Sequence, residues 1–423
     1  MRALGLDVGT TGIALVSVDL STGDVSLCGH TATPSLPSSF DGEHIQNADE
    51  IIRIAKDLID ANMTEDVCAI GISGQMHGIV YLNECGEAIS PLYTWQDKRG
   101  AAYAERLGAR VGYGHATHAY NAEKGLIPPS AVGYATIADA IACALCGLSR
   151  PVLHASNAAS LGCFDIDKNR FTHPFCHSYP YEIESSYRIA GSYRDVPVAI
   201  GIGDNQASVL GSGCLEGELL VNVGTGAQVS MLSSQQTDNA AVEVRPAFDG
   251  QYLLVGAALC GGRAYAMLHD FFCDVVEMAT GKRPDSLYGA MAAYQSNATD
   301  SSLRFDNTFC GTRQNPSRRG SICGIGRDNF TPEQFCLGIF EGIVGELAEL
   351  YGAMGNGANG LVGAGNALRK NPLLQRLCEK RFGEKMYLPD YTEEAAVGAA
   401  LYALISAGYL RDTDMASALL RKK

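Results

Sequence analysis

Two short segments, one in each half of the chain, combine glycine with hydroxyl residues in a way that suits phosphate binding. Residues 4–12 read LGLDVGTTG and residues 219–227 read LLVNVGTGA, with strand-like residues on both sides of each Val-Gly-Thr. A glycine turn lets backbone amides approach phosphate oxygens, and a threonine hydroxyl adds a donor. A single turn of this kind is often only a turn, but its repetition in both halves favours a common phosphate-binding role.

Only the first of these two turns carries an acid. Asp7 stands where the second copy has Asn222. Mg²⁺ is a hard cation that takes oxygen ligands and commonly binds together with phosphates. We therefore expect Asp7 to bind Mg²⁺, and we expect the two turns to hold a polyphosphate from both sides of a cleft between two related domains.

A second acid lies between a strand pattern and a helix pattern. Residues 201–213 read GIGDNQASVLGSG, and Asp204 follows the strand-like VPVAIGIG. A carboxylate at this junction could accept the proton of a substrate hydroxyl while that oxygen attacks a γ-phosphoryl group. The alternative is a helix N-cap, which is a common use of aspartate before a helix.

Two further segments suit the recognition of a polyol. GISGQMHGIVYL (71–82) places Gln75 and His77 after a strand, and PLYTWQDKRG (91–100) brings Trp95 and Asp97 together. The indole could stack on a sugar face while the carboxylate accepts hydroxyl hydrogen bonds. The only tryptophan of a chain can equally be a buried core residue.

The segment LVGAGNALRKNP (361–372) predicts a strand, a Gly-x-Gly turn and a helix, a junction that lets a flat base lie against the backbone. It is not the dinucleotide-binding pattern, because Leu368 stands where the third glycine would be and no strand-helix-strand unit follows with an acid about 20 residues on. The Walker pattern G-x-x-x-x-G-K-[ST] is also absent from the chain.

The order of predicted elements repeats between the two halves. Strands are expected at 2–7, 13–19 and 25–31, a helix at 48–62 with Asn47 as its cap, and a strand at 67–72. The second half opens with strands at 218–223, 227–232 and 252–257 and a helix near 263–279. Helices are also expected at 331–352 and at 392–407, the latter lined by small residues. This order predicts an α/β protein with a duplicated domain, residues 1–212 and 213–423.

Composition narrows the class of protein. A net charge of −14 argues against nucleic acid and anionic membranes as partners, and no apolar run is long enough for a membrane span. The 14 cysteines show no disulfide framework, so we expect reduced thiols and a cytoplasmic protein. Cys143 and Cys146 suit a buried helix, and a zinc site at His173, Cys176 and His177 is the less favoured interpretation of that loop.

Together these segments resemble the FGGY family of carbohydrate kinases, which belongs to the actin-like ATPase superfamily, and the resemblance runs over nearly the whole chain. The resemblance implies that the two domains are ribonuclease-H-like and lie around a central cleft. LGLDVGTTG and VNVGTG resemble the two phosphate hairpins of the family, GIGDN its catalytic segment and GAGNALRKN its adenosine segment. SGQMHG with TWQDKRG resembles the ketose-kinase branch. CGLSRPVLHASNAASLGCFD (146–165) points within that branch to sedoheptulose as the acceptor, with xylulose or another pentulose as the alternative.

The resemblance implies a role for each matching residue. Asp204 matches the general base and Asp7 the Mg²⁺ ligand. The residues implied in ATP binding are Gly9, Thr10, Thr11, Gly224, Thr225, Gly363, Gly365, Asn366 and Asn371. Those implied in sugar binding are Gln75, Met76, His77, Trp95, Asp97 and Asn205, to which Asn157 is a further candidate.

The chain departs from the family pattern in two respects. It is short for the family, and the stretch HATHAYNAEKGLIPP after Gly114 is trimmed where relatives have a fuller helix beside the sugar site. The second half also lacks long insertions. This difference would affect the contacts of the homodimer that the resemblance implies.

We therefore expect an ATP- and Mg²⁺-dependent ketose kinase with the sugar mainly on the first domain and the adenine on the second. An actin-like or chaperone-like ATPase would keep both hairpins but would have no use for SGQMHG together with Trp95 and Asp97. A sugar sensor without catalysis would not need both Asp7 and Asp204.

Overall fold

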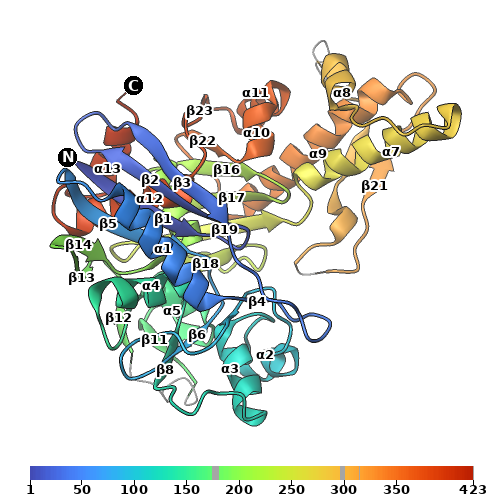
Figure 1. The fold of residues 1–423 in the computed structure, drawn as a ribbon. Coiled ribbons are helices and arrows are strands. Elements are labelled where there is room, and N and C mark those ends of the chain that lie inside the picture. The colour runs from blue at the N-terminus through green and yellow to red at the C-terminus, as the bar shows by residue number, and fades with distance from the viewer. Residues whose placement is uncertain (174–180, 296–300, 314, 423) are drawn as a thin grey trace. The chain divides into compact units, whose positions relative to one another are not determined.

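The computed structural model describes residues 1–173, 181–295, 301–313 and 315–422 of the chain (Figure 1). Cys176 and His177 of the less favoured zinc site lie outside these residues. The chain forms two compact units. The first comprises Met1–Leu215, Arg245–Tyr252 and Glu393–Lys423, and the second comprises Glu216–Val244 and Leu253–Thr392.

The first unit is built on a seven-stranded mixed sheet. Its order is β13-β14-β5-β1-β2-β3, and β15 pairs with β5 beside this path. β1 runs antiparallel to β2 and parallel to β5. The strands are β1 (Arg2–Val8), β2 (Gly12–Asp19), β3 (Val25–Ala32), β5 (Val67–Gly74), β13 (Ile189–Tyr193), β14 (Val196–Ala199) and β15 (Ile202–Gly203).

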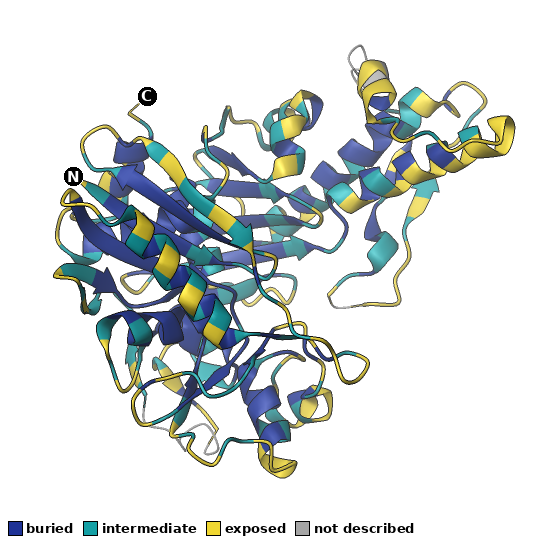
Figure 2. Cartoon of the chain, viewed as in Figure 1, coloured by how far each residue is buried: buried dark blue, intermediate teal, exposed yellow. Residues whose placement is uncertain are grey.

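Helix α1 (Ala48–Asn62) connects β3 to β5, as the sequence predicts. The Asn47 side chain accepts a hydrogen bond from the backbone of Glu50, which confirms the predicted cap. The helix buries Ile51, Ala55 and Ile59 in the core that also contains residues of β1, β2 and β5. Its opposite face is exposed, which gives the alternating colours along this helix in Figure 2.

The small-residue helix predicted near the C-terminus packs within the first unit. Helix α12 (Glu394–Ser406) contacts β1, β5 and helix α6 (Asp204–Gly211), so the red helix lies among blue strands in Figure 1. Glycines allow this approach: a Cβ at Gly71 would lie 1.8 Å from the carbonyl oxygen of Ala399, and one at Gly398 would lie 1.8 Å from that of Ala207. The small residues therefore serve close packing of helices and strands.

The second unit carries a six-stranded mixed sheet in the order β18-β19-β17-β16-β22-β23. β16 is antiparallel to β17 and parallel to β22, which repeats the pairing of β1 with β2 and β5. The strands are β16 (Leu219–Val223), β17 (Ala227–Ser233), β18 (Glu243–Pro246), β19 (Tyr252–Ala258), β22 (Leu361–Ala364) and β23 (Met386–Tyr387).

Two long helices of the second unit confirm the predicted ones. Helix α7 (Gly262–Thr280) follows β19, and helix α9 (Pro332–Ala353) begins after Thr331, whose side chain accepts a hydrogen bond from the backbone of Gln334. Pro332 occupies the first turn, where its missing N–H costs nothing. The shorter helices that follow β22 are α10 (Asn366–Lys370) and α11 (Pro372–Phe382).

Shorter elements complete the described chain. In the first unit they are β4 (Ile45–Gln46), β6 (Val80–Leu82), β7 (Leu92–Tyr93), α2 (Ala101–Leu107), α3 (Gly114–Glu123), β8 (Gly133–Ala135), α4 (Ile137–Cys146), β9 (Val152–His154), α5 (Ala155–Ser160), β10 (Phe164–Asp165), β11 (Arg170–Phe171), β12 (Glu182–Glu184) and α13 (Thr413–Leu420). In the second unit they are α8 (Tyr288–Gln295), β20 (Arg304–Asp306), η2 (Thr308–Cys310) and β21 (Ser321–Cys323).

The predicted division between residues 212 and 213 lies close to Leu215, where the main segment of the first unit ends. The first unit also takes in residues 393–423, which that division assigns to the second domain. The assignment of a sugar-binding and a nucleotide-binding domain stays a prediction. Within the described residues, no helix has both the length and the apolar character that crossing a membrane requires.

Candidate active site

Asp7 lies near the end of β1, beside the first glycine turn. Ser73 of the neighbouring strand β5 donates a hydrogen bond from Oγ to Asp7 Oδ1 at 2.6 Å. Burial raises the pKa of Asp7 to about 7, and the negative charges of Asp204 and Glu393 act in the same direction, whereas the Ser73 hydrogen bond lowers the pKa. A nearby positive charge would therefore stabilise the ionised form of Asp7.

Asp204 occupies the first turn of α6, directly after β15. The N-cap position belongs to Gly203, and no side chain caps this helix, so Asp204 is not the N-cap that the alternative interpretation required. Asn205 donates a hydrogen bond from Nδ2 to Asp204 Oδ1 at 2.8 Å. The pKa of Asp204 is raised, because burial outweighs the Asn205 hydrogen bond and the charge of Arg245, which lower it.

The Met76 thioether lies beside Asp204 and Asn205. Its Sδ accepts contacts from Asn205 Nδ2 at 3.7 Å and from Arg245 Nη1 at 3.9 Å. A Cβ at Gly203 would lie 2.8 Å from the same sulfur, so Gly203 lets the Met76 side chain come close to the start of α6. Met76, Asp204 and Asn205, predicted from two separate motifs, are thus brought together.

Arg245 was missed by the sequence analysis. In the sequence it is marked only as a single basic residue in the strand-like stretch VEVRPAF, and this pattern is equally typical of an exposed strand position. The structure buries it to 8% exposure instead.

His77 has a backbone conformation that is unusual for a residue other than glycine. Its φ is +73°, and Ser160 holds it: Ser160 Oγ accepts from the His77 backbone N–H at 3.1 Å, and His77 Nδ1 lies 2.8 Å from the Ser160 carbonyl oxygen. A carbonyl can only accept, so Nδ1 carries a proton and Nε2 of the neutral ring is an acceptor. The ring stacks on Tyr113 at 4.3 Å. An acceptor held in this way suits a substrate hydroxyl.

A polar network connects the first glycine turn with Trp95 and Gln75. The Trp95 indole donates from Nε1 to Thr10 Oγ1 at 2.9 Å, and Thr10 Oγ1 lies 3.4 Å from Gln75 Oε1. Gln46 donates to the Thr10 carbonyl oxygen at 2.7 Å and accepts from Gln75 Nε2 at 2.8 Å. Trp95 is 46% exposed, so it is not the buried core residue of the alternative interpretation.

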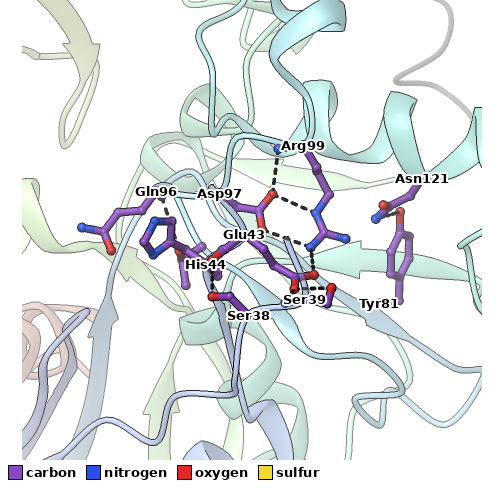
Figure 3. A network of polar contacts seen from close by, with 10 residues as sticks. Ser38, Ser39, Glu43, His44, Tyr81, Gln96, Asp97, Arg99 and Asn121 are labelled. Carbon is purple, nitrogen blue, oxygen red and sulfur yellow. Dashed lines mark hydrogen bonds and ion pairs between the residues drawn. The ribbon is translucent and has the colours of Figure 1, made fainter. Parts of the chain in front are cut away.

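Asp97 lies in a buried ion-pair network rather than at an exposed position (Figure 3). Its two oxygens accept from the backbone N–H groups of His44 and Arg99 and from the Arg99 guanidinium at 2.8–3.0 Å. Arg99 also pairs with Glu43 at 2.9 Å. Burial raises the pKa of Glu43, but hydrogen bonds from Ser39 and the charge of Arg99 bring it below its usual value. Asp97 thus orders the segment that carries Trp95.

Asn157 has a structural place next to Asp139. Its Nδ2 donates to Asp139 Oδ1 and to the Gly201 carbonyl oxygen, both at 3.0 Å. Asn157 is fully buried, and its Oδ1 has no hydrogen-bond partner among the described residues. It fixes the strand end that leads to Asp204.

The first glycine turn has the tight geometry that its sequence predicts. The Gly9 N–H donates to the Gly12 carbonyl oxygen at 2.9 Å, and Thr33 Oγ1 donates to the Gly9 carbonyl oxygen at 2.8 Å. Thr10 and Thr11 lie at the tip of this turn between β1 and β2.

The second glycine turn meets the start of helix α7. The backbone N–H of Gly262 donates to the Gly224 carbonyl oxygen at 2.8 Å, and that of Arg263 donates to the Thr225 carbonyl oxygen at 3.1 Å. A Cβ at Gly224 would meet nothing within 4 Å. The turn is therefore open at the glycine where a phosphate would approach.

The Gly-x-Gly segment lies next to this turn within the second unit. Gly365 has φ +89°, and a Cβ there would lie 2.5 Å from the carbonyl oxygen of Val223. Asn366 starts α10, and Asn371 donates from Nδ2 to the Ala367 carbonyl oxygen at 3.0 Å. Gly363 lies in β22. The residues predicted to bind the nucleotide in this half are thus gathered around β16 and β22.

Comparison with known proteins identifies the family. The model of the FGGY family of carbohydrate kinases, N-terminal domain, matches residues 2–125, and the C-terminal domain model matches residues 219–407. Sedoheptulokinase of Mus musculus is 27% identical, over 95% of this chain and 97% of that protein.

Solved structures share the fold. A ligand-bound xylulose kinase from Lactobacillus acidophilus matches with a TM-score of 0.84 and 18% identity, over 99% of this chain and 92% of that one. Plasmodium falciparum glycerol kinase with ADP matches with a TM-score of 0.80 and 16% identity, over 99% and 92%. The predicted α/β class and the resemblance are confirmed. The chain belongs to the FGGY family of carbohydrate kinases and is a phosphotransferase with a carbohydrate acceptor.

Proposed function

We propose that this protein transfers the γ-phosphoryl group of ATP to a ketose hydroxyl, with sedoheptulose as the acceptor and sedoheptulose 7-phosphate as the product. The observation that carries the proposal is the grouping of Asp204, Asn205 and Met76 at the start of α6, with hydrogen-bond and sulfur contacts between them. An acid, an amide and an apolar thioether suit a polyol with one reacting hydroxyl.

Asp204 acts as the general base. Its carboxylate accepts the proton of the attacking hydroxyl, and Asn205 Nδ2 keeps Oδ1 oriented through its 2.8 Å hydrogen bond. Met76 and His77 bind the sugar, the latter through the acceptor nitrogen Nε2. Gln75 and Trp95 border the sugar next to Thr10. Asp97 contributes to sugar binding indirectly, because it orders the segment that carries Trp95.

Gly9, Thr10 and Thr11 of the first unit donate hydrogen bonds to phosphoryl oxygens. In the second unit Gly224 and Thr225 do the same, and Gly363, Gly365, Asn366 and Asn371 receive the adenosine. Amides that are fixed before the reaction stabilise the charge of a transferring phosphoryl group without further reorganisation.

The donor chemistry of Asp7 fits Mg²⁺. Its oxygens are hard ligands, and its raised pKa reports a site where a cation would be stabilising. Asp7 would hold the ion, and the bound ion would supply positive charge to the phosphoryl oxygens. The proposal also includes a cytoplasmic location, which the free thiols of the described cysteines suit. A homodimer stays a prediction.

Sedoheptulose is favoured over xylulose because Mus musculus sedoheptulokinase is 27% identical over 95% of this chain, whereas a xylulose kinase of Staphylococcus epidermidis is 22% identical over 97%. The test is ADP release from Mg·ATP with sedoheptulose, xylulose, ribulose, fructose, gluconate and glycerol. We expect the highest kcat/KM with sedoheptulose. A higher value for xylulose would keep the mechanism and change the substrate, and no stimulation by any sugar would overturn the proposal.

A further inference from the structure

Helix α5 contacts two segments of the first unit that carry candidate site residues. One is β15, which ends directly before Asp204, and the other is the turn after β5, which contains His77. The helix has only six residues, so both segments are held from a very short stretch of chain. No side chain of α5 has a role in the reaction proposed above, and the purpose of these contacts is therefore a separate question.

The first turn of α5 fixes the backbone that leads to Asp204. Ser156 Oγ accepts a hydrogen bond from the Gly203 backbone N–H at 3.0 Å, and Asn157 Nδ2 donates to the Gly201 carbonyl oxygen at 3.0 Å. Gly203 is the N-cap residue of α6, and Asp204 is the first residue of that helix. The two bonds thus hold the peptide groups directly before the general base.

His154 sets the direction of the Ser156 hydroxyl. The backbone N–H of Ser156 donates to His154 Nδ1 at 3.2 Å, so Nδ1 is the ring nitrogen without a proton. Ser156 Oγ also lies 2.8 Å from Nδ1, and its hydroxyl therefore donates to this nitrogen. The lone pairs of Oγ remain to accept from the Gly203 N–H. The hydroxyl thus has one orientation in which both of its hydrogen bonds are made.

The use of histidine at this position leaves a buried donor unpaired. His154 is fully buried, and Nε2, which carries the ring proton, has no hydrogen-bond partner within the described part of the chain. Serine, threonine, asparagine and aspartate are the preferred N-cap residues and would bring no such donor. An unpaired buried donor destabilises the folded state. The arrangement therefore favours a task for His154 beyond capping α5, namely the orientation of Ser156.

The last residue of α5 holds His77. Ser160 Oγ accepts from the His77 backbone N–H at 3.1 Å, and the Ser160 carbonyl oxygen lies 2.8 Å from His77 Nδ1. Ser160 Oγ itself donates to the Asn157 carbonyl oxygen at 2.7 Å, which connects the two ends of the helix. One short helix thus contacts both the segment of the general base and a side chain that we assign to sugar binding.

We propose that α5 is the positioning helix of the acceptor site and that Ser156, oriented by His154, is a positioning residue for Asp204. Ser156 acts through the Gly203 N–H and Ser160 acts on His77, so the helix fixes the distance between the general base and the bound sugar. Reacting groups that are held in one geometry react faster than groups that must first find it. This inference rests on the functions proposed above for Asp204 and His77.

The test is the rate of phosphoryl transfer in a single turnover, measured by rapid quench with Mg·ATP and the most active sugar of the panel above. Misplacement of a reacting group by about 1 Å can cost about 10²-fold in rate. We therefore expect Ser156→Ala to lower this rate by about 10–10²-fold. The KM for ATP should stay unchanged, because the side-chain hydrogen bonds of Ser156 go to His154 and Gly203.

Ser212→Ala is the matched control. Ser212 is also fully buried, and its Oγ donates to the Val209 carbonyl oxygen at 2.7 Å at the other end of α6. Each variant loses buried hydrogen bonding next to the same helix, so urea unfolding should show a loss of stability in both. Only Ser156→Ala should slow phosphoryl transfer, and equal transfer rates in the two variants would overturn the inference.

Ser156→Cys carries the test if Ser156→Ala does not fold. A thiol is a weaker donor and acceptor than a hydroxyl, so the cysteine variant should also transfer the phosphoryl group more slowly than the wild type. A wild-type transfer rate in Ser156→Cys would then overturn the inference.

The two proposals fail in different ways. Full activity in Asp204→Asn would remove the general base and the inference with it. An inactive Asp204→Asn together with a wild-type transfer rate in Ser156→Ala would leave the kinase proposal standing and remove only the positioning role of α5.

Discussion

Ser73 Oγ donates a 2.6 Å hydrogen bond to Asp7 Oδ1, and this bond connects β5 to β1 at the point where both strands end near the first glycine turn. This hydrogen bond lowers the pKa of Asp7 and so opposes the burial that raises this pKa to about 7. The hydroxyl therefore helps to keep Asp7 ionised near neutral pH.

Replacing Ser73 should change the Mg²⁺ requirement in a pH-dependent way. In Ser73→Ala the pKa of Asp7 rises further, so less of the carboxylate is ionised at pH 6.5, and half-maximal activity should require more Mg²⁺ than in the wild type. At pH 8.5 the Mg²⁺ concentration that gives half-maximal activity should be nearly the same in the two proteins. Mg²⁺ titrations of activity at both values measure this, with Ser21→Ala at the exposed Asp19 turn as a control.

A Ser73→Ala variant with the same Mg²⁺ titration as the wild type at pH 6.5 would remove Asp7 from the metal site. Asp7→Ala should show the stronger effect, with lower activity and a weaker response to Mg²⁺.

His77 should contribute to sugar binding through its ring and not through its backbone. His77→Asn tolerates a positive φ, because asparagine enters the left-handed region more easily than most residues, but it lacks the imidazole acceptor. We expect a higher KM for the sugar and an almost unchanged KM for ATP in steady-state kinetics. Equal increases in both constants would place His77 outside the sugar site.

Asp139 should make stability depend on pH. Burial raises its pKa to about 7 in the folded protein, against 3.8 for the ordinary group, while Thr136 and Asn157 hydrogen bonds act in the opposite direction. The folded state thus binds this proton more tightly than the unfolded state does. The resulting contribution of Asp139 to the free energy of unfolding is full at low pH and is lost as the pH rises toward 7. The loss is at most about 4 kcal/mol.

In Asp139→Asn this contribution disappears, so the unfolding midpoint in urea should change less between pH 4.5 and 7.5 than in the wild type. Asp57→Asn, at an exposed position of α1, should keep the wild-type dependence. A parallel pH dependence in Asp139→Asn and wild type would show that Asp139 is already ionised when folded.

Gly71 should be required for the packing of α12 on β5. A Cβ at this position would lie 1.8 Å from the Ala399 carbonyl oxygen and 2.3 Å from its carbon, so the helix has to move. We expect Gly71→Ala to destabilise the protein by about 1–3 kcal/mol or more, which thermal unfolding would measure. Gly133→Ala is the matched control, since its Cβ would meet nothing within 4 Å. Equal stability of the two variants would contradict the packing argument.

The sequence predicted the local structure well because the periodicities and end signals are strong. The strands around Asp7, the helix capped by Asn47 and the helix that begins at Pro332 all lie close to their expected bounds. Their signals come from residues within one turn or one strand. The grouping of Asp204, Asn205 and Met76 also followed from motifs that end neighbouring strands.

What the sequence could not predict depends on long-range packing. The place of α12 beside β1 depends on glycines about 390 positions away from it in the chain, such as Gly5. The position of Arg245 beside Met76 depends on residues that are 169 positions apart in the chain, and the support of His77 depends on Ser160. The burial of Asp97 could not be foreseen, because the short spacing to Arg99 does not reveal the third partner, Glu43.

The most direct test of the central claim is sugar-dependent ADP release by Asp204→Asn, measured beside the wild type with sedoheptulose, and ATP binding measured on the same preparations. A general base contributes about 10²–10⁴-fold. We predict a loss of at least about 10²-fold in turnover with ATP affinity nearly unchanged. Turnover close to that of the wild type would contradict the assignment of Asp204 as the general base.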